Sequence, residues 1–170
     1  MKSTKTLIFF ILISAVAIKL PAQKLDISFR SYPSSWYNGY FEPAVDGSGL
    51  TLAWHPRISD KMHLTLSGEF DILRARSEFL IGTGVTRSLW TKNRLMLSIG
   101  ASLLNGIDLY KPHPLYVGGA EAALRFDYKI GKKSTSLFAL FGARYTVCPG
   151  YLEYGVYQYT SWPLGIGLSF

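Results

Sequence analysis

The chain ends, at residues 159–170, with the stretch Y-T-S-W-P-L-G-I-G-L-S-F. Its large apolar side chains fall at every second position, and Gly, Ser or Pro occupies the positions between them. The large set is Trp162, Leu164, Ile166, Leu168 and Phe170. This alternation predicts a β-strand with one large apolar face and one small face, ending on an aromatic residue.

Seven earlier segments alternate in the same way. They are residues 25–31, 50–54, 62–72, 79–89, 95–103, 116–128 and 137–145. Short turns are predicted at 56–61, 74–77, 90–93 and 129–134, and longer Gly-, Pro- and aromatic-containing loops at 32–47, 104–114 and 148–158. Eight segments of this kind predict an all-β fold, an eight-stranded antiparallel up-and-down transmembrane β-barrel.

The two faces of the predicted strands differ in side-chain size. One carries large apolar residues, and the other is mostly Gly, Ser, Thr and Ala with a few charges. An eight-stranded barrel has interior space only for its own side chains, so the large face must point outward, toward acyl chains. Two soluble folds remain as alternatives, a lipocalin-like barrel with its apolar face inward and a β-sandwich.

Aromatic residues near the strand ends support this orientation. Tyr32, Tyr116, Tyr145 and Trp162 fall near one end, and Trp54, Tyr128 and Phe170 near the other. Amphipathic rings favour the membrane interface, so these positions predict two aromatic girdles.

The closing strand with its terminal aromatic residue resembles that of bacterial outer-membrane β-barrels, and the overall pattern resembles the OmpX and OmpA transmembrane barrels. The resemblance implies location in the outer membrane and contact with its lipid and lipopolysaccharide. It also implies that Trp162, Leu164, Ile166, Leu168 and Phe170 form a signal read by the barrel-assembly machinery. An OmpA-type peptidoglycan-binding domain is not expected, because the chain ends with the barrel.

Residues 1–22 have the pattern of a cleaved signal peptide, with Lys2 and Lys5 before an apolar run and small residues before Gln23. We therefore expect residues 23–170 to form one barrel domain. Three of the eighteen basic residues lie in the signal segment, which leaves fifteen against eleven acidic ones, a net charge of +4. No basic cluster accompanies a nucleic-acid-binding motif, so nucleic-acid binding is not predicted. Cys148 has no partner cysteine and is predicted to be a loop or rim residue.

Several charged residues fall on the small face and are predicted to point into the lumen. They are Arg30, Glu69, Asp71, Glu121, Arg125, Asp127 and Arg144. Because an unpaired buried charge costs several kcal/mol, we expect these residues to pair with one another in a polar network. This arrangement resembles the interior of the OmpX and OmpA barrels, whose ion networks block free passage. The alternative is a narrow, gated ion channel.

Histidine positions bear on metal binding and catalysis. His55 and His63 flank the first short turn and could face each other, but no third metal ligand is placed beside them. Outer-membrane lipid A deacylases and palmitoyltransferases use histidine with serine and a carboxylate on the outer half of the barrel. His55 and His63 lie at the other end, and His113 has no nearby serine. No catalytic, cofactor or metal site is predicted, and a lipid-modifying enzyme remains the alternative.

Two predicted outer loops are rich in aromatic residues. These residues include Trp36, Tyr37, Tyr40 and Phe41 in the first loop and Tyr151, Tyr154 and Tyr157 in the last. Rigid rings are typical of recognition surfaces, although rings that pack on one another over the barrel mouth would produce the same pattern. The sequence therefore favours a structural or interaction role in the outer membrane, with an accessory subunit of a larger complex as one form of it.

Overall fold

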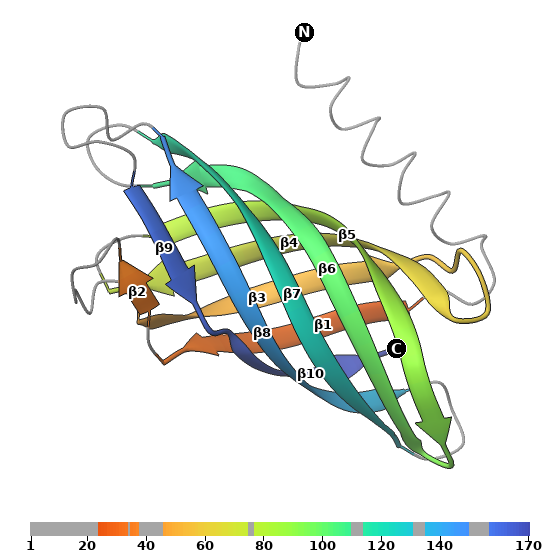
Figure 1. Cartoon of the computed structure of the whole chain (residues 1–170). Coiled ribbons are helices and arrows are strands. Elements are labelled where there is room, and N and C mark those ends of the chain that lie inside the picture. Colours follow the sequence, from red (N-terminus) through yellow and green to blue (C-terminus); the bar gives the residue numbers. More distant parts are fainter. Residues whose placement is uncertain are drawn as a thin grey trace, which may run out of the picture.

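A computed structural model describes residues 24–33, 35–37, 46–74, 77–109, 114–130, 135–149 and 157–170. Ten strands lie within these ranges (Figure 1). They are β1 (Lys24–Tyr32), β2 (Ser35–Tyr37), β3 (Gly47–His55), β4 (Met62–Leu73), β5 (Ser77–Lys92), β6 (Leu95–Asp108), β7 (Leu115–Lys129), β8 (Ser136–Cys148), β9 (Tyr157–Ser161) and β10 (Leu164–Ser169). None of the described residues belongs to a helix long and apolar enough to cross a membrane.

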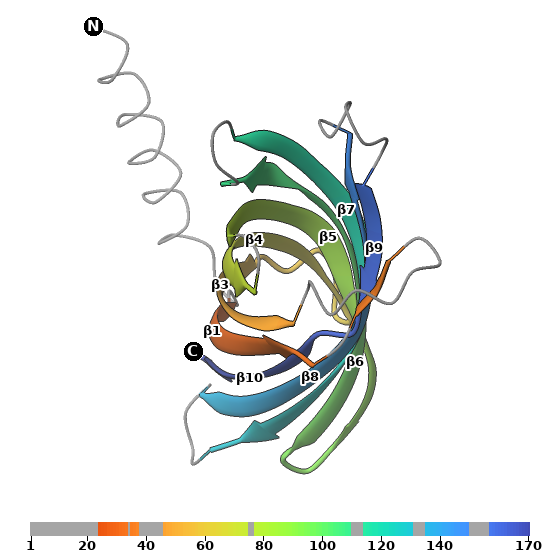
Figure 2. The same ribbon diagram turned by 90° about the vertical axis from the view of Figure 1, so that its left-hand side faces the viewer.

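The ten strands form one closed antiparallel barrel (Figure 2). The barrel has eight positions around its ring, which we call staves, and each is made of one strand or of two strands in line. β1 and β2 make one stave, interrupted near Pro33, and β9 and β10 make another, interrupted at Trp162 and Pro163. β8 pairs with both β9 and β10, while β1 pairs with β10 and β2 pairs with β9. The predicted eight-stranded up-and-down barrel is confirmed.

Several strand boundaries differ from the sequence prediction. β2 lies within the predicted loop 32–47, where three residues pair with β9. β6 continues through Asn105 and Gly106, which were predicted to be in a loop. Gly106 lies against the carbonyl oxygen of Phe79 on β5, where a Cβ would collide. This glycine therefore lets β5 and β6 approach each other closely, and it does not form the turn that the sequence predicted.

The closing strand is broken where its sequence contains Pro163. Proline has no N–H to donate to a ladder, and here its carbonyl oxygen accepts a bond of 2.9 Å from the backbone N of Gly142. The hairpin between β5 and β6 is tighter than predicted, because both strands extend to a turn at Asn93 and Arg94. Asn93 has a φ of 55°, a left-handed conformation that asparagine tolerates.

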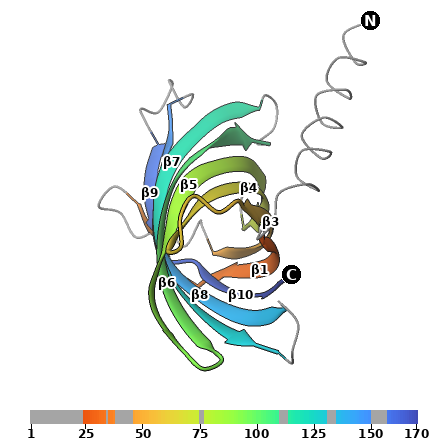
Figure 3. The same cartoon turned by 90° about the vertical axis from the view of Figure 1, so that its right-hand side faces the viewer.

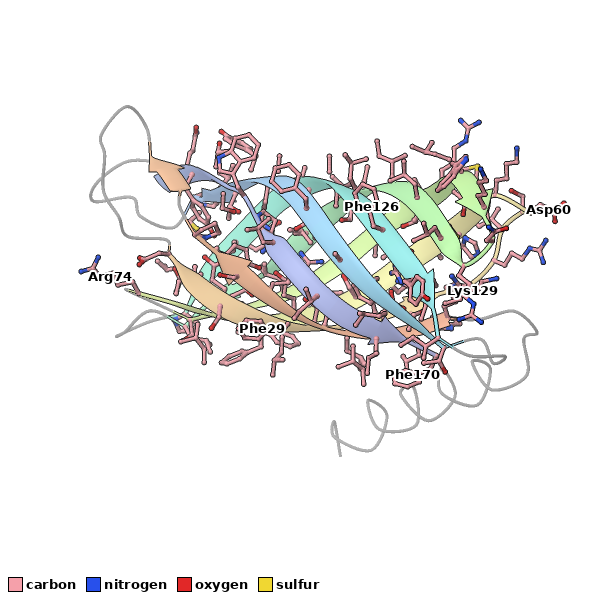
Figure 4. All side chains as sticks on the ribbon, turned by 90° about the horizontal axis from the view of Figure 1, so that it is seen from below. Phe29, Asp60, Arg74, Phe126, Lys129 and Phe170 are labelled. Atoms are coloured by element: carbon pink, nitrogen blue, oxygen red, sulfur yellow. The ribbon has the colours of Figure 1, made fainter. Side chains whose placement is uncertain are left out.

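The large apolar side chains point outward, as predicted. Leu52, Phe126 and Ile166 each expose more than half of their surface, at 53%, 55% and 63%. Phe29 and Phe126 are labelled on the outer wall in Figure 4. Of the predicted girdle residues, Tyr116, Tyr145, Tyr128, Trp162 and Phe170 are outward and exposed, whereas Tyr32 is buried. Tyr32 was wrongly assigned to a girdle, because its position shares the inward parity of Ser28 and Arg30.

Both chain termini of the barrel lie at one end, which we call the terminal end. There the backbone N of Phe170 donates to Leu25 O (2.9 Å), and Leu25 N donates to Phe170 O (3.2 Å). The hairpins at 56–61 and 93–94 lie at the same end, and we call the opposite end the distal end. Met62, the first residue of β4, pairs with Arg87, so the tip of the β5–β6 hairpin extends past β4 (Figure 3).

Candidate functional site

The lumen of the barrel contains an ion-paired group that we call the central cluster. Its members are Arg30 on β1, Glu69 and Asp71 on β4, Glu121 on β7 and Arg144 on β8. Their positions alternate with the outward apolar residues, so the period of each strand directs them inward. All five are buried.

Arginines connect the carboxylates of the central cluster. Arg30 Nη1 donates to both oxygens of Glu121, at 2.9 and 2.7 Å, and lies 3.2 Å from Glu69 Oε2. Arg144 donates to Glu121 Oε2 through Nε (2.9 Å) and Nη2 (2.6 Å). The two guanidinium groups therefore share Glu121.

Arg144 also reaches the opposite wall of the barrel. Its Nη2 lies 2.5 Å from Glu69 Oε1, and its Nη1 lies 3.1 Å from Asp71 Oδ2. In the order of staves, β4 and β8 are separated by three staves on either side, so they face each other across the lumen. One side chain thus links two opposite walls at this level.

Tyr32 adds the remaining donor of the central cluster. Its hydroxyl donates to Glu69 Oε1 at 2.6 Å and lies 3.0 Å from Asp71 Oδ1. The Arg144 guanidinium lies 5.3 Å from the centre of the Tyr32 ring. With three carboxylates, two arginines and one phenol, the cluster has hydrogen-bond donors directed at each of its acids.

A second group, the terminal cluster, lies in the lumen nearer the terminal end. It consists of Asp26, His55, Arg125 and Asp127. Arg125 donates to Asp127 in a bidentate pair, Nε to Oδ2 at 2.9 Å and Nη2 to Oδ1 at 2.7 Å, and its Nη1 also contacts Asp26. His55 Nε2 lies 2.8 Å from Asp26 Oδ2, and His55 Nδ1 lies 3.1 Å from Thr65 Oγ1. The Arg125 guanidinium stacks on Phe138, 3.8 Å from the ring centre.

A third group, the distal cluster, fills the lumen near the distal end. Glu78 and Asp108 are cross-strand partners, and the Tyr159 hydroxyl donates to Glu78 at 2.9 Å. Cys148 is fully buried beside an apolar layer of Leu80, Leu104 and Val117. The prediction that Cys148 is a loop or rim residue is wrong, because β8 extends to this residue and presents it inward.

A small cavity remains between the central and terminal clusters. Its volume is about 70 Å³, and its walls include Ser67, Thr86 and Ser102 as well as charged residues of both clusters. A cavity of about 20 Å³ lies beside His55 and His63. Such volumes hold a few water molecules at most.

The seven lumen residues predicted from sequence all lie inside the barrel, in two groups. Arg30, Glu69, Asp71, Glu121 and Arg144 meet in the central cluster, whereas Arg125 and Asp127 pair in the terminal cluster. Five further lumen residues were not among those predicted from the sequence: Asp26, Tyr32, Glu78, Asp108 and Tyr159. Strand parity could have found Asp26, which alternates with Leu25 and Ile27, but Asp108 required knowing that β6 continues past Gly106.

His55 and His63, which the sequence allows to face each other across the hairpin, line the same small cavity but contact different neighbours. His63 forms a bridge with Arg57, and the ring of His55 contacts Thr65 and Asp26 instead. The predicted terminal-strand set occupies the outer wall, with Leu164, Ile166, Leu168 and Phe170 exposed.

Other predicted features fall outside the described residues. These are the signal segment 1–22, His113 and the loop residues Tyr40, Phe41, Tyr151 and Tyr154. The side chains of Trp36, Tyr37 and Tyr157 are not described either.

Comparison with solved structures places this geometry among known folds. Neisserial surface protein A aligns with a TM-score of 0.62 at 12% identity, over 86% of this chain and 94% of that chain. The chain folds as a small outer-membrane-type β-barrel. The N-terminal β-barrel domain of Pseudomonas aeruginosa OprF (TM-score 0.50, 16% identity) and OprG from the same organism (TM-score 0.50, 10% identity) each cover 86% of this chain, and it covers 97% and 94% of theirs.

At these identities the likeness to known barrels concerns the fold alone. No protein-family model matches the chain, and no curated protein sequence matches it. What this barrel does must therefore be argued from its own lumen and surfaces.

Proposed function

We propose that this protein is an outer-membrane β-barrel with a structural or interaction role and a lumen closed to ions. In this proposal the barrel is exported by its signal segment, inserted by the barrel-assembly machinery and surrounded by outer-membrane lipid and lipopolysaccharide. The terminal end faces the periplasm and the distal end faces outward. The exposed apolar belt, with Leu52, Phe126 and Ile166 among its residues, supports the membrane location.

The ion pair between Arg144 and Asp71 is the observation that best supports a closed lumen. A side chain that bonds to both opposite walls leaves no open passage through the centre at its level, and Arg30 with Glu121 occupies the space beside it. Moving an ion past this point would require breaking buried pairs, each costing several kcal/mol. The geometry therefore supports a plugged lumen over the narrow channel.

Planar-bilayer recording tests the closed lumen. The purified barrel should show no stable conductance, because the charged groups of the central cluster are paired with one another. A double variant, Arg144→Ala with Asp71→Ala, removes the link between opposite walls and should raise leak current if it stays folded. Discrete openings of the unaltered protein would instead establish the channel alternative.

The interaction role rests on the aromatic residues at the distal end. Tyr116 and Tyr145 are exposed there, and Tyr145 donates to Gln158 at 2.6 Å. In the proposal, the partner-binding surface also includes the aromatic residues predicted from sequence, of which Trp36 and Tyr37 belong to β2 and Tyr157 to β9: Trp36, Tyr37, Tyr40, Phe41, Tyr151, Tyr154 and Tyr157. Segments at the rim of a rigid scaffold are suited to binding a second membrane protein.

Crosslinking and mass spectrometry in the native membrane test the interaction role. A reproducible neighbour should be recovered with the unaltered protein and lost on Trp36→Ser, Tyr37→Ser and Tyr40→Ser together, because truncated interface anchors often cost 2 kcal/mol or more. Heat-modifiable gel mobility should be unchanged in this variant. Recovery of the protein only as a monomer, or unfolding of the triple variant, would contradict an accessory-subunit role.

The proposal includes no enzymatic activity. In the part of the chain that the structure describes, both histidines lie toward the terminal end, with His55 held by Asp26 and Thr65. The lipid-modifying alternative is tested by mass spectrometry of lipid A from cells that express the protein. A change in acyl-chain number would contradict the structural role.

A further inference from the structure

The described cations of this barrel are concentrated at the terminal end. Seven basic residues lie there: Lys24, Arg57, Lys61, Arg87, Lys92, Arg94 and Lys129. Figure 4 shows the labelled Lys129 and Asp60 at this end and Arg74 at the other. A surface that carries charges of one sign attracts ligands of the opposite sign.

Acidic side chains of the described residues do not supply that charge. Asp60 pairs with Arg57, while Asp26 and Asp127 point into the lumen and pair with Arg125. Among the described residues, no ion pair joins Arg87, Lys92 or Arg94 to a carboxylate. These three cations therefore remain available to an external anion.

Two of these cations lie on the outward face of the β5–β6 hairpin. Residues directly opposite each other in an antiparallel ladder share a face. Arg87 is opposite Ile99, and Lys92 is opposite Leu95. Both of these apolar partners are exposed on the outer wall. The guanidinium and ammonium groups thus belong to the surface that carries the apolar belt.

A β-bulge lies between the two cations. The register shifts between Ser88 and Trp90, so Leu89 and Trp90 both fall opposite Leu97. Leu89 exposes 51% of its surface and Trp90 48%. We call Arg87, Leu89, Trp90 and Lys92 the hairpin patch.

We propose that the hairpin patch binds the headgroup of an anionic phospholipid. Arg87 and Lys92 would hold the phosphodiester, because guanidinium and ammonium groups are its usual protein ligands. Trp90 and Leu89 would lie at the level where acyl chains meet headgroups, as indole and long cationic side chains do at membrane interfaces. Tyr128, exposed and opposite Leu95 on the next strand, continues the same level.

A lipid fits this patch better than a soluble anion does. A free phosphate or an acidic peptide would satisfy the two cations but leave Leu89, Trp90 and Leu95 in water. A phospholipid satisfies both kinds of side chain at once. The vestibule of about 780 Å³ at the terminal-end mouth offers the competing position for a soluble anion. Its lining includes Lys61 and Lys129, together with Leu89 and Trp90 of the hairpin patch, but not Arg87 or Lys92.

Lipid retention measured by native mass spectrometry tests the proposal. The full-length barrel is placed in nanodiscs of equal phosphatidylglycerol and phosphatidylcholine, released in the spectrometer, and its bound lipids are counted. The unaltered protein should retain phosphatidylglycerol preferentially. Arg87→Gln with Lys92→Gln should reduce that preference about 25-fold, since each basic residue near an anionic surface contributes about fivefold, the equivalent of about 1 kcal/mol.

Matched variants locate the effect. Lys61→Gln with Lys129→Gln removes the same charge from the same end but from the vestibule, and it should retain the preference. Arg87→Lys with Lys92→Arg keeps the charge and should also retain it, which separates charge loss from misfolding. Equal loss in the vestibule variant, no preference in the unaltered protein, or displacement of the lipid by inorganic phosphate would overturn the proposal.

The inference relies on the barrel lying in a bilayer, as proposed above, and the two can fail separately. Failure of the barrel to enter nanodiscs would contradict the outer-membrane location. Entry without a headgroup preference would contradict only the lipid site. Because both leaflets of a nanodisc have the same composition, the result does not depend on which end faces the periplasm.

Discussion

Arg144 on β8 and Asp71 on β4 form an ion pair of 3.1 Å between opposite walls of the barrel. The backbone bonds of each strand join it only to its neighbours, so opposite walls are linked by side-chain contacts such as this one. The same guanidinium group serves Glu69 and Glu121. Arg144 is therefore the residue on which the filling of the lumen depends most.

Replacing Arg144 with Gln should strongly destabilise the barrel. Asp71 would lose its arginine partner, and Glu69 and Glu121 would keep only Arg30. Breaking a buried pair in this way costs about 3–5 kcal/mol. Urea unfolding in detergent or lipid measures the loss. Arg57→Gln is the matched control: its pair with Asp60 is exposed, so the loss should stay below about 1 kcal/mol. Equal effects of the two variants would refute the central role of Arg144.

Tyr32→Phe tests the phenol that sequence analysis assigned to a girdle. The change removes only the hydroxyl that donates to Glu69. Glu69 keeps its contact with Arg144, so the loss is that of one hydrogen bond to a charged group, about 1.5–3 kcal/mol. Tyr116→Phe removes an exposed hydroxyl that donates to Asn105 and should change stability by less than about 0.5 kcal/mol. Unfolding midpoints in urea compare the two variants. A neutral Tyr32→Phe would mean that water replaces the phenol.

An arginine placed on the outer wall should be costly at mid-depth and tolerated near an end. Phe141 lies in the middle of β8 and stacks with Trp162 at 6.5 Å, so Phe141→Arg should cost about 2–4 kcal/mol in a bilayer. Leu97 lies near the hairpin tip, opposite the bulge, and Leu97→Arg should cost about 0–1 kcal/mol. Reversible unfolding from lipid vesicles measures both. Tolerance of Phe141→Arg would argue that this wall does not face acyl chains.

Deleting Phe170 should impair insertion into the outer membrane without reducing export to the periplasm. The deletion removes both an aromatic ring on the outer wall and two backbone bonds to Leu25. Phe170→Ala separates these parts, because it keeps the backbone bonds and loses only the ring. Quantitative blotting of membrane and periplasmic fractions provides the readout. If Phe170→Ala reaches the membrane as well as the unaltered chain, the ring is incidental and only the bonds matter.

Strand parity alone determined which side of the wall each residue faces. Successive side chains of a strand point to opposite faces because of backbone geometry, so Arg30, Glu121 and Arg144 could be placed in the lumen before any contact was known. The same reasoning placed Leu164, Ile166 and Phe170 outside. The alternation can be used only within a strand. Cys148 and Asp108 were assigned to loops because the predicted strands ended before them, whereas β8 and β6 reach these residues.

Only the closed tertiary structure decided which lumen charges meet. Arg144 reaches Asp71 because closure brings β4 and β8 face to face, and the sequence separation of 73 residues carries no sign of it. Closure likewise brought Asp26 on β1 to Arg125 on β7, and Tyr32 to Glu69. Alternation is a local property of the backbone, whereas contacts across the lumen depend on the stagger of eight staves around a ring, which local sequence does not encode.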